Sequence, residues 1–287
     1  MVTMSDDDRL AIVTVTYNSG RYLDDFLAST RQASASDVPV VVVDNGSSDE
    51  RSLRDVAARY GARFVPMGRN AGYGAAVNRA VAELAVRPDW VLVSNPDVVL
   101  SAGSLDRLRA TAEEDSDTGS VGPAVIETDG SIYPSARRIP SLRTGLGHAL
   151  FANLWPDNPW TKLYHADDRP QVRRSVGWLS GACLLVRGDV FTRLGGFDER
   201  YFMYFEDVDL GWRIGRAGLA NVYDPAISVV HVGAHATNDS SREMRRAHHR
   251  SAYLFLSTRY HGWHLLPLRL VLRAGLTLRS MLPSRGL

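Results

Sequence analysis

The sequence predicts an α/β fold in which a mostly parallel sheet is flanked by helices, with a helical tail at the C-terminus. Short β-branched apolar runs recur through the first hundred residues, and segments with helical apolar spacing separate them. Strands that alternate with helices in this way form parallel sheets through right-handed crossovers. With 287 residues, 45% of them apolar and 23% charged, the chain can bury a substantial core.

The first strand is predicted over Leu10–Thr16, a continuous apolar run typical of a strand buried on both faces. The polar segment Tyr17–Gly20 ends it. A helix is expected next, because the following apolar residues share one helical face: Tyr22, Leu23, Phe26 and Leu27.

Two more strands are predicted at Val38–Val43 and Arg63–Pro66. The helix between them has apolar residues at i, i+3, i+4 and i+7: Leu53, Val56, Ala57 and Tyr60. Ser47 and Glu50 have the spacing of a capping box at the start of this helix.

A glycine-rich turn, Gly68–Gly74, is predicted to lead into a helix that runs through Ala85, and Trp90–Ser94 forms the next strand. The turn is not a dinucleotide-binding fingerprint, because the third glycine is missing and the turn does not follow the first strand. An NAD-dependent Rossmann enzyme is therefore excluded.

The second half of the chain is less regular. A hairpin is predicted at Asp129-Gly130, and Pro140–Pro170 is expected to be a long loop of functional importance or high mobility. Strand character resumes over Val176–Arg187 and returns at Asn221–Tyr223 and Ile227–Val230.

Three carboxylates, Glu206, Asp207 and Asp209, follow a run of aromatic residues. They lie in the first turn of a predicted helix, whose apolar residues follow at Leu210, Ile214 and Ala217. Acidic residues at a helix start can simply complement the helix dipole. A carboxylate at an apolar rim can also serve as a general base, because desolvation raises its basicity. The local pattern leaves both interpretations open.

Polar residues follow several predicted strands, at Thr16–Asn18, Asp44-Asn45 and Asn95–Asp97. Ligands of open α/β sheets bind at the carboxyl ends of strands, so these residues are expected to converge. Asn95-Pro96-Asp97 could bind a divalent cation together with substrate phosphates, but taken alone the tripeptide favours a simple turn. His231 is either a second metal ligand or an ordinary histidine at a strand end.

The C-terminal segment differs in charge from the rest. Residues 240–287 hold nine Arg and one Glu, a net charge of +8, which leaves −7 for residues 1–239. This asymmetry indicates an anionic partner for the tail. No apolar run is long enough to span a bilayer, and the acidic N-terminus is unlike a signal peptide. Cys183, the only cysteine, lies in an apolar run and is expected to be buried and inert.

As an ordered set, the motifs resemble those of family 2 inverting glycosyltransferases of the GT-A fold, and among these the rhamnosyltransferases of mycobacterial arabinogalactan synthesis. The resemblance covers about residues 9–235 and rests on six segments: Val15–Asn18, Val43–Asp49, Asn70–Gly74, Asn95–Asp97, Trp178–Ala182 and Phe205–Asp209. It implies a transferase domain over residues 1–239, with a nucleotide-binding half at about 9–125 and an acceptor-binding half at about 126–235. Residues 240–287 form the basic, apolar tail.

The resemblance also implies roles for individual residues. Those expected to line the nucleotide-sugar pocket are Thr16, Tyr17, Asn18, Asp44, Asn70, Gly72, Asn78, Asn95 and Asp97, with Asp44 accepting from the pyrimidine N3–H. Asp97 and His231 would bind a divalent cation, Mg²⁺ or Mn²⁺. Asp207 would be the catalytic base. Trp178, Gly181, Glu206 and Asp209 would form the acceptor or sugar pocket.

The implied reaction moves L-rhamnose from dTDP-L-rhamnose to a polyprenyl-diphosphate-linked N-acetylglucosamine in bacterial cell-wall synthesis. The expected location is the cytoplasmic face of the membrane, with the tail docked on anionic lipid. Packing of the tail on the catalytic domain or on a second subunit is the alternative. No nucleic-acid partner is expected, and a homo-oligomer stays open. Two alternatives remain: a family 2 enzyme using another sugar, such as galactofuranose or glucose, and a non-catalytic nucleotide-sugar-binding partner.

Overall fold

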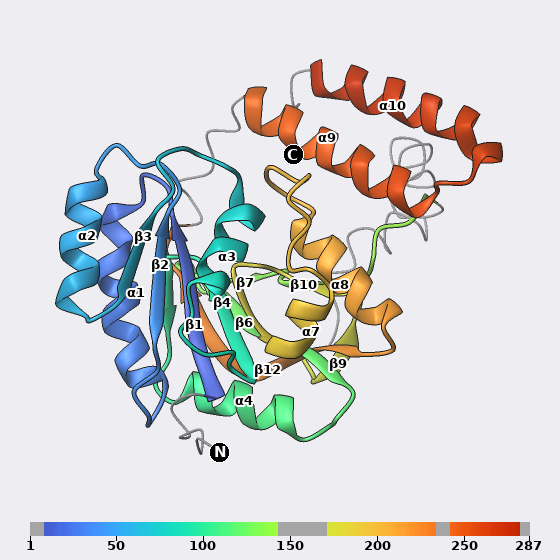
Figure 1. The fold of residues 1–287 in the computed structure, drawn as a ribbon. Coiled ribbons are helices and arrows are strands. Elements are labelled where there is room, and N and C mark those ends of the chain that lie inside the picture. Colours follow the sequence, from blue (N-terminus) through green and yellow to red (C-terminus); the bar gives the residue numbers. More distant parts are fainter. Residues whose placement is uncertain (1–8, 143–170, 234–241, 282–287) are drawn as a thin grey trace.

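A computed structural model describes residues 9–142, 171–233 and 242–281. Within these residues, one large mixed sheet is covered by helices on both faces, and a pair of helices lies at one end (Figure 1). The α/β fold predicted from the sequence is confirmed.

The first half of the chain builds the parallel part of the sheet. Its strands lie in the order β3-β2-β1-β4 and all their pairings are parallel. The elements are β1 (Leu10–Thr16), α1 (Gly20–Ala33), β2 (Val40–Asp44), α2 (Glu50–Arg59), β3 (Arg63–Pro66), α3 (Tyr73–Ala82) and β4 (Trp90–Ser94). The strands β1, β3 and β4 have the predicted bounds, whereas β2 begins at Val40 rather than Val38.

The second half extends the sheet with mixed pairing. Strand β11 runs antiparallel to β4 and β6, whereas β12 is parallel to β6 and antiparallel to β5. The elements are β5 (Val98–Leu100), α4 (Ser104–Glu113), β6 (Thr118–Glu127), β7 (Ile132–Tyr133), β8 (Ala136–Arg137), β9 (Arg174–Val176), β10 (Trp178-Leu179), β11 (Cys183–Arg187), α7 (Gly188–Arg193), α8 (Glu206–Arg216) and β12 (Ala220–His231). The predicted hairpin is present as the β6–β7 pair.

Side chains alternate between two hydrophobic layers, one on each face of the sheet. On β1, Leu10 and Ile12 pack against the layer of α1, α2 and α4. Val13 and Val15 face the opposite layer, which contains α3, α7 and α8. A strand buried on both faces needs a continuous apolar sequence, which explains the run recognised at Leu10–Thr16.

Three local predictions need correction. The capping box is wrong: α2 begins after Asp49 without a side-chain cap, and the Ser47 hydroxyl instead accepts from the backbone N–H of Asn18. Val176–Arg187 is divided among three strands, because each part pairs with a different partner. The two short strands after residue 220 are one strand, β12, with a register shift between Asp224 and Ser228. Residues 143–170 of the predicted long loop lie outside the described residues.

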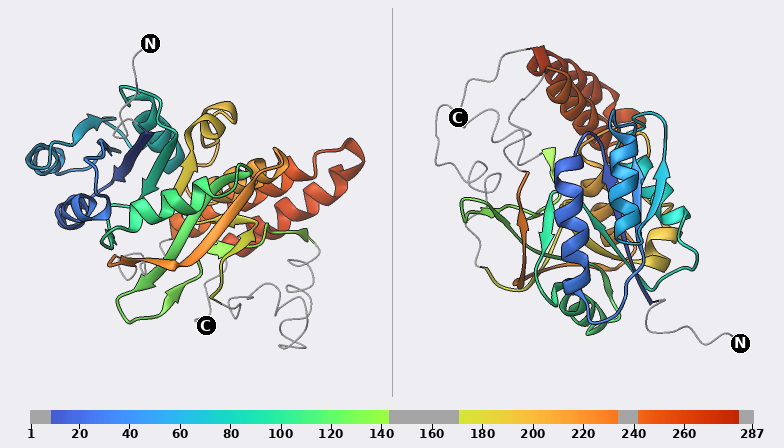
Figure 2. Two further views of the ribbon diagram at one scale, coloured as in Figure 1. Left: turned by 90° about the horizontal axis from the view of Figure 1, so that it is seen from below. Right: turned by 90° about the vertical axis from the view of Figure 1, so that its left-hand side faces the viewer.

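The described part of the tail is a helical hairpin, α9 (Arg242–Arg259) and α10 (Leu266–Met281), which lie side by side (Figure 2). Helix α9 contacts the body, with Phe255 fully buried, whereas α10 exposes large apolar side chains. In the part of the chain that the structure describes, no helix is long and apolar enough to cross a membrane.

Candidate functional site

The ends of β1 and β2 form the first part of the site. The Thr16 hydroxyl donates to the Asp44 carboxylate at 3.2 Å, and that carboxylate also accepts from the backbone N–H of Ser47 at 3.1 Å. Asn18 has a positive φ of 51°, and its side-chain oxygen accepts from the backbone N–H of Ser48. Tyr17 is 50% exposed beside them. The predicted residues therefore do converge at one edge of the sheet.

Asp44 is fully buried, and protein donors occupy its carboxylate. In this structure it therefore organises the strand-end loop, and its contact with a pyrimidine stays a prediction.

The glycine-rich turn packs directly against these loops. The Asn45 side chain donates to the Asn70 side chain at 3.0 Å and accepts from the backbone N–H of Ala71 at 2.9 Å. Gly72, at φ 95°, lies so close to the backbone of Phe202 that a Cβ would be 2.5 Å from its carbonyl oxygen. Only glycine suits this position, which ties the turn to the segment that precedes the acidic helix.

A second cluster joins the ends of three strands. Asp97 follows β4, His231 ends β12, and Glu127 ends β6 in parallel register with His231. Nε2 of His231 is 3.3 Å from Oδ1 of Asp97, and its Nδ1 is 3.6 Å from Oε1 of Glu127. Burial disfavours the charged imidazole, but Asp97 and Glu127 outweigh that effect and raise the pKa of His231. Sequence reasoning missed Glu127, although its position at a strand end was a usable signal.

The donor set of this cluster fits a divalent cation that also binds substrate phosphates. Among the residues that the structure describes, Oε2 of Glu127 is buried without a hydrogen-bond partner, and Oδ1 of Asp97 and Nδ1 of His231 have only the ion-pair contacts given above. Buried carboxylate and imidazole atoms whose contacts do not meet hydrogen-bond geometry are ones that a cation would satisfy. Among the residues described, no three His, Cys, Asp or Glu side chains are arranged as a complete metal site. A cation here would take oxygen ligands from its substrate as well.

The acidic helix α8 starts immediately after a strained turn. Tyr204 and Phe205 have φ values of 66° and 69°, in the left-handed region that bulky residues avoid. Glu206 is 7% exposed, and its Oε2 has no hydrogen-bond partner among the residues that the structure describes.

Asp207 is held differently, because its Oδ2 accepts from the backbone N–H of Gly181 at 3.1 Å and its Oδ1 from that of Val208 at 2.8 Å. Burial raises the pKa of both Asp207 and Glu206 above the ordinary carboxylate range, and the charge of Asp207 raises that of Glu206 further. These two backbone N–H groups stabilise a negative charge on Asp207, and Glu206 has no such pair of donors. Asp207 is therefore the member of the pair suited to carry the negative charge.

The Ser180–Ala182 segment links the acidic helix to the Asn95–Asp97 end. The backbone N–H of Asn95 donates to the carbonyl of Ala182 at 3.0 Å, and the Tyr73 hydroxyl donates to that of Gly181 at 2.9 Å. A Cβ on Gly181 would be 3.3 Å from the Tyr73 ring. Tyr73 thus lies beneath the site, and sequence reasoning gave it no role.

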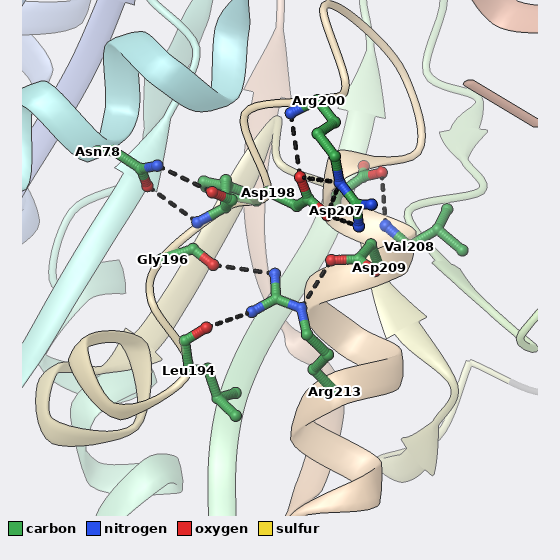
Figure 3. Close-up of polar contacts among 10 residues, drawn as sticks. Asn78, Leu194, Gly196, Asp198, Arg200, Asp207, Val208, Asp209 and Arg213 are labelled. Carbon is green, nitrogen blue, oxygen red and sulfur yellow. Dashed lines mark hydrogen bonds and ion pairs between the residues drawn. The ribbon is translucent and has the colours of Figure 1, made fainter. Parts of the chain in front are cut away.

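Asp209 is not in the pocket predicted for it. It is 2% exposed and pairs with Arg213 at 2.6 Å, and Arg213 donates to the carbonyls of Leu194 and Gly196 (Figure 3). Residues two apart in sequence are rotated by about 200° around the helix axis, so Asp207 and Asp209 lie on opposite sides of α8 and do not share a pocket. Asp209 anchors α8 to the preceding loop.

Asn78 and Trp178 have structural partners in the protein, and their predicted places in the pocket stay predictions. The Asn78 side chain accepts from the Phe197 backbone N–H and donates to its carbonyl, both at 2.9 Å (Figure 3). Trp178 donates to the Arg138 carbonyl and packs against the cluster of Tyr201, Val208 and Phe255. Both residues support the segments on either side of α8.

Comparisons with a protein family and with individual proteins all point to glycosyltransferases. Residues 8–253 match the family described as "Glycosyltransferase like family 2". The chain is 47% identical, over 97% of its length and 94% of the relative's, to the N-acetylglucosaminyl-diphospho-decaprenol L-rhamnosyltransferase of Mycobacterium tuberculosis. It is 26% identical to rhamnosyltransferase WbbL of Escherichia coli, over 86% of this chain and 92% of that one.

Solved structures share the fold at low identity. The mannosyltransferase PcManGT of Pyrobaculum calidifontis, in complex with GDP-Man and Mn²⁺, has a TM-score of 0.59 and 16% identity, covering 95% of this chain and 70% of its own. GalNAc-T7 with UDP, GalNAc and Mn²⁺ has a TM-score of 0.58 and 14% identity, covering 80% and 44%. The predicted GT-A fold is confirmed.

Proposed function

We propose a specific reaction for this chain, which belongs to glycosyltransferase-like family 2 and is a glycosyltransferase: it moves L-rhamnose from dTDP-L-rhamnose to N-acetylglucosaminyl-diphospho-decaprenol. The near-full-length 47% identity to the mycobacterial enzyme supports this choice of substrates. The observation that carries the chemistry is Asp207, a half-buried carboxylate that accepts a hydrogen bond from the backbone N–H of Gly181.

In the proposed mechanism, Asp207 accepts the proton of the acceptor hydroxyl as the hydroxyl oxygen attacks the anomeric carbon. The new bond joins this carbon to the acceptor oxygen, the bond to the diphosphate oxygen breaks, and dTDP leaves. A single direct displacement inverts the anomeric centre, so a β-L donor gives an α-L-rhamnosyl product. Asp97 and His231 would hold a divalent cation, Mg²⁺ or Mn²⁺, which when bound neutralises charge on the leaving diphosphate.

The test is to incubate the purified protein with a panel of nucleotide sugars and a lipid-linked N-acetylglucosamine diphosphate, and to identify the product by mass. We expect a deoxyhexose to be added only with dTDP-L-rhamnose. A product from a galactofuranose or glucose donor would support another family 2 specificity, and no product with any donor would favour a non-catalytic binding partner.

We further propose that the tail docks the enzyme on an anionic membrane at its cytoplasmic face. The apolar face of α10 and the turn before it exposes Trp263 (87%), Leu266 (50%), Leu270 (56%) and Val271 (70%). Helix α9 adds the exposed arginines Arg246 and Arg250, and each basic residue near an anionic surface contributes about 1 kcal/mol. A lipid-linked acceptor is itself anchored in a membrane, so an enzyme that acts on it must approach that membrane.

Replacing Trp263, Leu270 and Val271 together by Ser should abolish co-sedimentation with vesicles that contain anionic lipid, because the inserted apolar area is lost. These side chains are exposed, so the fold should be unaffected. The matched control is Val172→Ser, which changes a side chain that is 54% exposed on the catalytic body. Equal binding by the triple variant and the wild type would refute docking through α10, and binding that is independent of salt and anionic lipid would refute the electrostatic part.

A further inference from the structure

The turn that precedes the acidic helix holds an unfavourable conformation. Tyr204 and Phe205 are the only non-glycine residues besides Asn18 with positive φ in the described part of the chain. Such conformations persist where neighbouring structure imposes them. The carbonyl of Phe205 accepts from the backbone N–H of Asp209, so this turn sets where α8 begins and where its carboxylates point.

One side of the turn is held by the glycine-rich turn and the start of α3. The backbone N–H of Tyr73 donates to the carbonyl of Phe202 at 3.1 Å, and Gly72 packs against the same residue.

The other side is held by α9, from the tail. The Ser251 hydroxyl donates to the carbonyl of Met203 at 2.8 Å, and Ser251 is 4% exposed. The turn is therefore fixed by hydrogen bonds on two consecutive carbonyls, one from each side.

Aromatic packing reinforces the contact with α9. The Phe255 ring lies 5.8 Å from that of Phe205 and 6.0 Å from that of Trp212, so it spans the turn and the helix that follows. The exposed imidazole of His248 lies edge-on to Tyr204 and Phe205, at 5.5 and 5.4 Å between ring centres. Phe255 is fully buried in this cluster.

We propose that α9 is a positioning clamp for the catalytic carboxylates, with Ser251 and Phe255 as positioning residues. The clamp fixes the Tyr204-Phe205 turn and thereby aims Asp207 at the acceptor. Since α10 packs on α9, the same tail that carries the exposed apolar face also carries part of the support for the active site. The role in turnover rests on the proposed transfer reaction.

The test compares Ser251→Ala with the wild type in the full chain. A small displacement of a catalytic group can lower the rate by as much as about a hundredfold, and we expect kcat to fall by about tenfold or more while the KM for the nucleotide sugar changes less than about twofold. Ser251→Thr keeps the hydroxyl and should restore most of kcat. Ser257→Ala is the matched control, because its hydroxyl bonds only within α9, to the carbonyl of Leu254.

Hydrogen–deuterium exchange gives a readout that does not depend on the reaction. In Ser251→Ala and Phe255→Leu, exchange in peptides covering residues 200–208 should accelerate while exchange in β1 stays at the wild-type rate. Unchanged exchange at 200–208, unchanged kcat in Ser251→Ala, or an equal acceleration in β1 would each overturn the clamp. Absence of rhamnose transfer by the wild type would overturn the proposed reaction instead, and the exchange result would still decide whether α9 holds the turn.

Discussion

Replacing Asp207 by Asn should lower the rate of sugar transfer by about a hundredfold to ten-thousandfold, the range typical of losing a general base. The amide has nearly the same shape, and its oxygen can still accept from the backbone N–H of Gly181. Affinity for dTDP should therefore remain close to that of the wild type. The measurements are single-turnover transfer of labelled rhamnose and calorimetric titration with dTDP.

Glu206→Gln is the informative comparison, because Glu206 is the adjacent buried carboxylate with an unpartnered oxygen. We expect it to have a smaller effect on the rate than Asp207→Asn. Asp189→Asn serves as a control, since Asp189 pairs with Arg187 at the protein surface. Substantial transfer by Asp207→Asn, with loss of transfer in Glu206→Gln, would assign the base to Glu206.

The pH profile provides a second readout of the same assignment. A general base must be deprotonated, so transfer should fall as the pH drops through the pKa of the carboxylate pair. Burial raises the pKa of Asp207, so the acid limb should lie above the value of about 3.9 for an ordinary aspartate. An acid limb at or below that value would argue against a partly desolvated carboxylate as the base.

Removing divalent cations should stop turnover, and this is the second large effect expected. Asp97 and His231 lie 3.3 Å apart at the strand ends, beside a buried oxygen of Glu127, and the proposed leaving group is a diphosphate. Neutralising charge on the leaving group contributes several kcal/mol, which corresponds to a rate change of about a hundredfold or more. Chelator should abolish transfer, and added Mg²⁺ or Mn²⁺ should restore it.

Asp97→Asn tests the proposed metal ligand directly and should raise the cation concentration needed for half-maximal dTDP binding. That titration does not depend on catalysis. Asp189→Asn again provides a carboxylate control away from the site. Full activity in chelator, by protein that elemental analysis shows to be metal-free, would refute the requirement.

The sequence by itself determined the parallel half of the sheet and the polar edge beside it. The strands Leu10–Thr16 and Trp90–Ser94 are buried on both faces. A strand buried in this way needs a nearly continuous apolar sequence, and such a run can be recognised without a structure. Parallel strands bring their carboxyl ends to one edge, which is why Asp44, Asn95 and Asp97 could be grouped without a structure. The six ordered motifs then identified the family.

Only the tertiary structure decided which polar residues face that edge and which support it. Asp207 and Asp209 are both aspartates in the first turn of α8. Asp209 pairs with Arg213 one turn later in the same helix, whereas the N–H of Gly181 reaches Asp207 only because α8 docks against a distant segment. Ser251 meets Met203 across 48 residues of sequence, and no local pattern encodes such a contact. Side-chain type and periodicity are local properties, whereas the partner of a buried polar group depends on how distant elements pack.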